Sequence, residues 1–203
     1  MPSTTLLLNA GHSVDPPKIG AYQSRMMGRY LGFLAKCEKP RILDVGPVNG
    51  KNIDFLLEQG ARIYVCDIFA RLGYRAALNI QPENLRQFFD YEDACFDAVQ
   101  IWDIPDHLYQ SSLDELVRQC TRVLKPNGVL MALIANSTSV QPFLHYFVIN
   151  DKSNVLLQRV ENNKLPYYYR SNRDMEGAMK PLEQLCSFVC MNGVREFLFK
   201  KPF

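Results

Sequence analysis

The stretch RILDVGPVNGKNIDFLLEQGARIYVCD, residues 41–67, constrains the fold of this chain more than any other. Its apolar run at residues 42–45 is too short for a helix and predicts a strand buried on both faces. Gly46 and Gly50 bracket a tight turn, where glycine permits a positive φ or lets backbone N–H groups approach a ligand. An apolar helix face and a second strand ending at Asp67 follow. The pattern is a β-α-β unit with a carboxylate at the ligand-binding edge of the sheet, where it can accept both hydroxyls of a ribose.

Two later motifs predict further sheet strands. In CFDAVQIWDIPDHL, residues 95–108, Phe96 and Asp97 introduce a short apolar run that reads as a buried strand. In SSLDELVRQCTRVLKPNGVLMALIA, Ser112 and Glu115 form a capping box at the start of an amphipathic helix. The sequence KPNG breaks that helix, and Val129 to Ile134 is expected to be another buried strand.

The end of the chain predicts an antiparallel hairpin. Leu185 to Met191 and Val194 to Lys200 are two strand-like runs on either side of Asn192-Gly193, a dipeptide favoured in type I′ turns.

These motifs together resemble those of the class I S-adenosylmethionine-dependent methyltransferases, of the type 11 kind. DVGPVNG resembles the glycine motif D/E-x-G-x-G-x-G, FDAV resembles FDxV, and RVLKPNGVL resembles RVLKPGGxL. The resemblance covers roughly residues 41–201. It implies an α/β Rossmann-like three-layer sandwich, with a mainly parallel seven-stranded sheet closed by the C-terminal antiparallel hairpin. We expect one domain over residues 1–203, with residues 1–40 as an arm and helix and residues 136–171 as a lid or interface excursion.

The resemblance also implies an enzyme with S-adenosyl-L-methionine as cofactor, and it suggests which residues bind it. Asp67 matches the ribose-binding acid of the family, and Trp102 is expected either to flank the adenine or acceptor or to pack in the core. The expected cofactor-binding residues are Asp44, Gly46, Pro47, Gly50, Asp67, Ile68 and Trp102.

Val48 departs from the family motif, because it stands where the middle glycine would be. A β-branched residue disfavours positive φ. Pro47 fixes its own φ and favours an extended Gly46, so we expect Val48 to keep a negative φ with its side chain away from the cofactor. The turn is then expected at Gly46, Asn49 and Gly50.

Candidates for a catalytic base follow the fourth predicted strand. Asp103 and His107 lie at the expected edge of the sheet, either as a base for an acceptor that carries a proton or as a loop cap and a solvated histidine. Alignment of acceptor, methyl and sulfur supplies much of the rate in methyl transfer, so the protein need offer little more.

Composition limits the partners and the compartment. A net charge of +2 does not by itself indicate nucleic acid or an anionic membrane, and the chain has no apolar run of eighteen residues that could span a membrane. The six cysteines form no C-x-x-C pair and read as free thiols in a reducing compartment, so we expect a cytoplasmic protein without a bound metal.

The remaining segments are less regular. Residues 1–16 read as an arm, residues 17–36 as an amphipathic helix, and residues 70–78 as helical, while residues 82–89 fit either a helical turn or an irregular third strand. The excursion at 136–171 contains LPYYYRSNR, which interleaves aromatics with arginine. Because it has only two arginines, nucleic acid is disfavoured, and we expect a lid or a homodimer contact instead.

Three functions remain open from the sequence. A methyltransferase acting on a small-molecule acceptor leads, since N-P-P-Y and Pro-Cys signatures of base methylation are missing. A non-catalytic methyltransferase-like interaction module is the alternative, which Val48 and the lack of a clear base favour. An NAD-dependent oxidoreductase is disfavoured by the glycine spacing and by the terminal hairpin.

Overall fold

A computed structural model describes residues 18–72, 80–135 and 143–203 of the chain. The expected arm at residues 1–16 lies outside the described residues. Within the described ranges, no helix is long and apolar enough to cross a membrane.

The centre of the molecule is a six-stranded sheet with the order β3-β2-β4-β5-β9-β8. Four strands run parallel, and the last two are antiparallel to their neighbours. The strands are β2 Arg41–Val45, β3 Arg62–Cys66, β4 Phe96–Trp102, β5 Leu124–Ile134, β8 Glu183–Val189 and β9 Arg195–Lys200. The predicted α/β fold with a terminal antiparallel hairpin is therefore confirmed.

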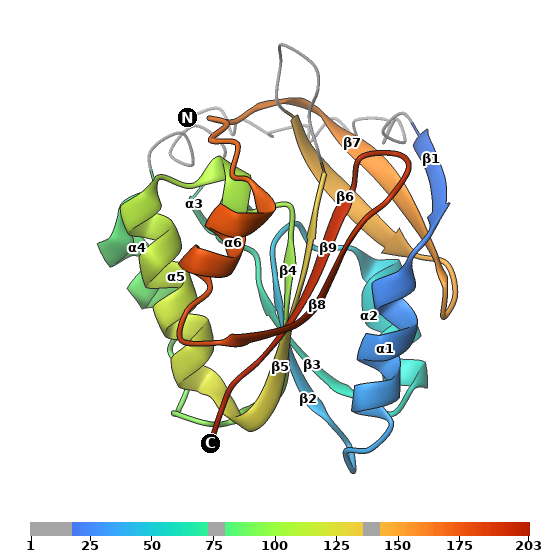
Figure 1. Cartoon of the computed structure of the whole chain (residues 1–203), viewed down its shortest axis with the longest axis vertical. Helices are drawn as coiled ribbons and strands as arrows, with labels where there is room; N and C mark the ends of the chain where they lie inside the picture. The colour runs from blue at the N-terminus through green and yellow to red at the C-terminus, as the bar shows by residue number, and fades with distance from the viewer. Residues whose placement is uncertain (1–17, 73–79, 136–142) are drawn as a thin grey trace, which may run out of the picture.

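Helices cover both faces of this sheet and form three layers (Figure 1). On one side lie α1 Arg25–Leu34 and α2 Gly50–Glu58, and their apolar faces share a core with Trp102 and Leu198. On the other side are α4 Pro82–Phe88, α5 Gln110–Val123 and α6 Asn172–Ala178. The short helices α3 Ile68–Leu72 and η2 Pro105–His107 follow β3 and β4 at the carboxyl edge of the parallel strands.

A second, smaller sheet has the order β1-β7-β6 and is antiparallel throughout. It consists of β1 Lys18–Gln23, β6 Phe143–Ile149 and β7 Asn154–Lys164. Its buried side chains Phe147 and Val155 pack into the same core as α1. The excursion at residues 136–171 thus contributes a sheet to the described fold, and Figure 1 shows that sheet beside β9 and α1.

The single helix expected at residues 17–36 is wrong in its first third. Residues Lys18–Gln23 form β1, because pairing with β7 overrides the helical spacing of Ile19 and Tyr22. The helix itself starts after Ser24, whose side chain accepts a hydrogen bond from the backbone N–H of Met27.

Two local predictions in the second half of the sheet also need correction. Pro82–Phe88 is helix α4, with Pro82 in its first turn, so the described sheet has six strands instead of seven. Residues 73–79, part of the stretch expected to be helical, lie outside the described residues. The capping box is wrong because α5 begins at Gln110, and the hydroxyl of Ser112 donates to the carbonyl oxygen of Ile80 instead.

Candidate functional site

Gly46 makes the turn between β2 and α2. Its φ is +137°, and a Cβ at this position would lie 3.0 Å from the carbonyl oxygen of Trp102, so a side chain would be both strained and blocked. The backbone N–H of Gly46 donates to the carbonyl oxygen of Cys66 over 3.3 Å. The turn therefore fits closely against the ends of both neighbouring strands.

Val48 adopts a negative φ, as the sequence predicts. The described non-glycine residues with a positive φ are Lys39, Ala94, Asp103 and Asn127. The expected left-handed turn at Asn49 is wrong, because Asn49 has a φ of −129° and caps α2 by accepting from the N–H of Lys51. Within the glycine motif, residues 44–50, only Gly46 has a positive φ.

Asp67 lies half-buried directly after β3 and contacts the glycine motif. One carboxylate oxygen accepts from the N–H of Val48 at 3.2 Å, and the other accepts from the N–H of Ala70 at 2.8 Å. A carboxylate has about four acceptor positions. Two acceptor positions of Asp67 therefore remain, which is the number that the two hydroxyls of a ribose need.

Asp44 and Trp102 are hydrogen-bonded to each other, and Trp102 packs directly against Gly46 in the turn. Both are almost fully buried, and Asp44 accepts hydrogen bonds from the indole N–H of Trp102 and from the side-chain amide of Gln100. Burial raises the pKa of Asp44 to about 6, although the bonds from Trp102 and Gln100 oppose that shift. The indole also stacks on Phe147, so the structure favours core packing for Trp102 over a direct contact with adenine.

The other expected cofactor residues differ in their exposure. Pro47 and Ile68 are buried, whereas Gly50 is exposed as the first residue of α2. The structure thus brings the glycine turn and Asp67 together, with Asp44, Pro47, Ile68 and Trp102 as their support.

Asp103 lies at the end of β4 and is enclosed by hydrogen-bond donors. Its carboxylate accepts from the backbone N–H groups of Ala135 and His145 and lies 2.8 Å from the Nδ1 atom of His145. Burial alone would raise the pKa of Asp103, but its interactions with His107 and His145 outweigh burial and lower that pKa. Asp103 is therefore an ionised, fully occupied acceptor.

His107 lies on the other side of Asp103, with its Nε2 atom 3.7 Å from the carboxylate and its Nδ1 atom 2.9 Å from the carbonyl oxygen of Pro166. Burial alone would lower the pKa of His107, but the hydrogen bond and charge of Asp103 outweigh it and raise the pKa. The structure thus brings both sequence candidates together, and neither is a solvated loop residue.

Sequence reasoning missed two residues near this site, His145 and Asn52. His145 enters from β6, which belongs to the excursion. The buried side-chain amide of Asn52 donates to the carbonyl oxygen of Phe147 and accepts from the N–H of Ile149. No local signal marks either residue. Asp103, the partner of His145, lies 42 residues before it, and the partners of Asn52 lie 95 and 97 residues after it.

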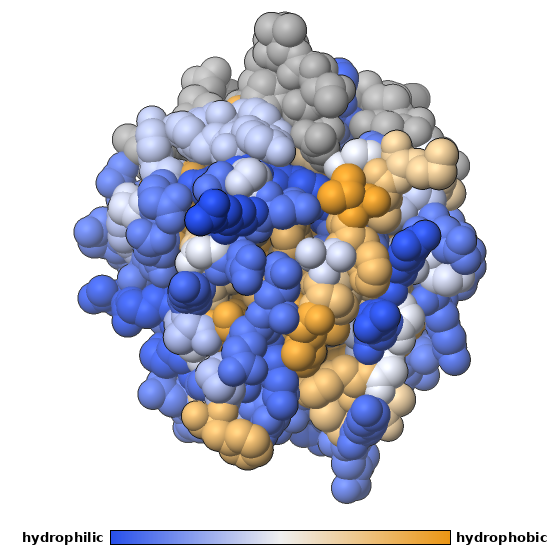
Figure 2. Space-filling view, viewed as in Figure 1, coloured by the Kyte–Doolittle hydropathy of each residue, from blue (hydrophilic) through white to orange (hydrophobic). Residues whose placement is uncertain are grey.

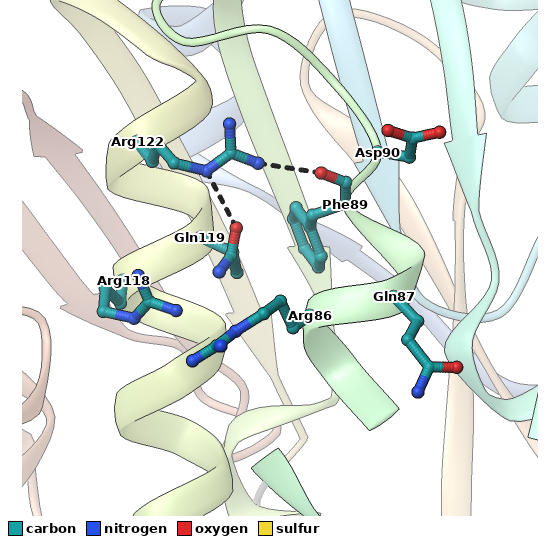
Figure 3. A pocket seen from close by; sticks show the side chains of 7 residues that line it. All are labelled: Arg86, Gln87, Phe89, Asp90, Arg118, Gln119 and Arg122. Carbon is teal, nitrogen blue, oxygen red and sulfur yellow. Dashed lines mark hydrogen bonds between the residues drawn. The ribbon is translucent and has the colours of Figure 1, made fainter. Parts of the chain in front are cut away.

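A separate hollow lies between α4 and α5 and has arginines on its walls (Figure 3). Arg122 donates to the carbonyl oxygen of Phe89 and to Gln119, and Arg118 is paired with Glu115. One wall comes from α4 and the residues after it, and the other from the last turns of α5, which run toward the amino ends of the strands, away from Gly46. Arg86, through Glu115, and Arg122, through the Phe89 carbonyl, hold α4 against α5.

Comparisons with known proteins agree with this architecture. Residues 43–132 match the family model of the methyltransferase domain. A search of curated proteins finds no match.

Solved structures with the same fold include several methyltransferases. One is the 1,6-didemethyltoxoflavin-N1-methyltransferase of Burkholderia thailandensis with bound 1,6-didemethyltoxoflavin and S-adenosylhomocysteine, which is 14% identical with a TM-score of 0.56 over 88% of this chain and 78% of that chain. An S-adenosylmethionine-dependent methyltransferase of Methanosarcina mazei is 14% identical with a TM-score of 0.53, over 89% and 98% of the two chains. One from Clostridium acetobutylicum is 13% identical with a TM-score of 0.55, over 86% and 92%.

At such low identity the structural matches establish the fold alone, whereas the family model identifies the domain that carries the glycine turn and Asp67. Residues 43–132 therefore match a methyltransferase domain, and the chain shares its fold with S-adenosylmethionine-dependent methyltransferases.

Proposed function

We propose that the protein transfers a methyl group from S-adenosyl-L-methionine to a small-molecule acceptor, with Asp67 as the ribose-binding residue. The hydrogen bond between the Val48 N–H and the Asp67 carboxylate carries this proposal, because it joins the glycine turn and the acid at one edge of the sheet. When bound there, the cofactor supplies an electrophilic methyl group on a sulfonium. Gly46 and Gly50 offer backbone at the turn, and Asp44, Pro47, Ile68 and Trp102 support it from below.

Several observations favour a small acceptor over a nucleic acid. The net charge is only +2, and of the two arginines in the LPYYYRSNR segment, Arg170 is buried and donates to the carbonyl oxygens of Pro105 and Leu108. The similar Burkholderia structure holds 1,6-didemethyltoxoflavin beside S-adenosylhomocysteine. The six free cysteines fit a reducing compartment, which supports a cytoplasmic location.

Calorimetric titration with S-adenosylhomocysteine, S-adenosylmethionine and NAD in parallel tests the cofactor. Each charge-assisted hydrogen bond is worth about 1.5–3 kcal/mol, so Asp67→Ala should weaken binding of both sulfur compounds at least about tenfold. Asp54→Ala, which removes an exposed aspartate of α2, is the matched control and should leave binding unchanged. Saturable binding of NAD alone, or full affinity in a folded Asp67→Ala variant, would refute the assignment.

A non-catalytic interaction module is the second candidate, favoured by the exposed Val48 side chain in the turn and the buried Asp44. Such a module would show no methyl transfer to any member of an acceptor panel, whether or not it binds S-adenosylhomocysteine.

A further inference from the structure

The cluster of Asp103, His107 and His145 lies next to the glycine turn. Trp102 touches Gly46 through its backbone oxygen and Cβ, and Asp103 is the next residue along the chain. Asp103 has a φ of +53°, a backbone conformation that non-glycine residues rarely adopt. Its carboxylate accepts from the backbone N–H of His145 on β6, so the cluster lies where β4 ends, at the same edge of the sheet as the glycine turn.

The position of the proton on His145 follows from its partner. Asp103 accepts two backbone N–H groups and is ionised, so it can only accept from His145 Nδ1, which lies 2.8 Å away. Nδ1 therefore donates to Asp103, and Nε2 is the ring nitrogen that remains to exchange a proton with an acceptor. Among the described residues none bonds Nε2, and the side chain of His145 retains 10% exposure.

His107 cannot serve in the same way. Its Nδ1 must donate to the carbonyl oxygen of Pro166, and its Nε2 faces the Asp103 carboxylate at 3.7 Å. Both ring nitrogens of His107 thus face acceptors within the protein, which leaves neither to take a proton from an acceptor substrate. Arg159 lies opposite His145 on β7 and carries only hydrogen-bond donors, so it cannot accept the Nδ1 proton in place of Asp103.

We propose that His145 is the general base of methyl transfer, positioned by Asp103, and that the acceptor carries an O–H or N–H proton. This inference rests on the proposed function. The acceptor's lone pair forms the new bond to the methyl carbon, while the carbon–sulfur bond breaks and leaves its electrons on sulfur. The acceptor's proton moves to His145 Nε2, and the resulting imidazolium is stabilised by the Asp103 carboxylate.

Nitrogen-15 NMR of the imidazoles tests the arrangement without any acceptor, and the chain has only three histidines to assign. We expect a proton on Nδ1 of His145, where it donates to Asp103, and a proton on Nδ1 of His107, where it donates to Pro166. Saturating S-adenosylhomocysteine should shift the His145 Nε2 signal. A His145 with the proton on Nε2, or an Nε2 signal that the cofactor product leaves unchanged, would overturn the proposal.

Methyl-transfer activity provides the second measurement. It compares acceptors that carry a proton, such as phenols and ring N–H heterocycles, with acceptors that carry none, such as tertiary amines and thioethers. His145→Gln should lower kcat for proton-bearing acceptors at least about a hundredfold, with the Kd for S-adenosylhomocysteine within about threefold of wild type. Asp103→Asn should return His145 to a mixture of tautomers and lower kcat in the same direction. Equal losses for acceptors that have no proton would show a merely structural role and overturn the proposal.

The two proposals fail in different ways. If wild type does not bind S-adenosylhomocysteine, the proposed function fails and the base role fails with it. If wild type binds it while His145 shows the wrong tautomer, only the base role fails.

Discussion

At the scale of single residues, the exposed Val48 departs from the glycine motif without straining it. Its φ is negative and its backbone N–H still reaches Asp67, so the contact that a glycine would make is preserved. Valine at this position therefore does not argue against cofactor binding.

Val48→Gly should consequently change the Kd for S-adenosylhomocysteine by less than about tenfold, or 1.4 kcal/mol. Gly46→Ala is the informative contrast, because its new Cβ would meet the Trp102 carbonyl at 3.0 Å and should abolish tight binding. Titration calorimetry of both variants checks this. A large gain in affinity for Val48→Gly would show that valine obstructs the site.

Asp44 offers a prediction about pH. Its pKa of about 6 in the folded state exceeds the usual value near 3.8, so the folded protein holds this proton more tightly than the unfolded chain does. The stability that protonation contributes is fully present below about pH 4 and is lost as the pH rises through 6.

Asp44→Asn should therefore raise the free energy of unfolding relative to wild type at pH 7.5, by about 3 kcal/mol at most, and much less at about pH 4. An asparagine oxygen can still accept from Trp102, and its amide can donate to Gln100 Oε1, which has no partner among the described residues. Urea denaturation at both pH values measures the difference, with Asp54→Asn as the exposed control. A difference that does not depend on pH would contradict the assignment.

At the scale of elements, Asn52 ties the small sheet to helix α2. β6 is an edge strand, and the Asn52 amide satisfies one carbonyl and one N–H on the strand, as a neighbouring strand would. This holds the small sheet against α2, the helix that begins at the glycine turn.

Asn52→Ala should lower the free energy of unfolding by about 2–4 kcal/mol, because it leaves two buried backbone groups without a partner. Amide exchange of the Ile149 N–H should accelerate at the same time. Asp54→Ala on the exposed face of α2 should change neither quantity. An unchanged exchange rate at Ile149 would mean that the sheet is held elsewhere.

The elements that the sequence predicts well are those with local signals. The β-α-β unit, the strand at residues 96–102 and the terminal hairpin follow from period and glycine. The type I′ turn expected at Asn192-Gly193 is wrong, because only Gly193 has a positive φ and its N–H donates to the carbonyl oxygen of Cys190. β1 could not be predicted, because its pairing partner β7 lies some 130 residues later in the sequence. The same holds for His145, which reaches Asp103 only after β6 has packed beside β4.

At the scale of the whole molecule, the sheet ends in an edge that is unusually apolar. β8 pairs only with β9 in the described part of the chain, and residues 185–191, LCSFVCM, contain neither charge nor proline. Leu185, Val189 and Met191 are exposed. Figure 2 shows apolar surface across the front of the molecule, where β8 runs in Figure 1. Edge strands usually carry charges or proline that prevent pairing with another chain.

Residues 136–171 are the other surface expected to form a homodimer contact. The described aromatic side chains of this excursion mostly pack within the chain. Phe147 is buried against Trp102, and Tyr146 packs partly against the core.

We therefore expect sedimentation over a range of concentrations to show self-association of the wild type through β8. Val189→Lys should weaken that association at least about tenfold, because a lysine on the edge strand cannot be buried by a second copy. Leu57→Lys, which changes an equally apolar exposed residue on α2, should leave association unchanged. A wild type that stays monomeric, or association that survives Val189→Lys and is lost on changing Tyr146, would place the contact away from β8.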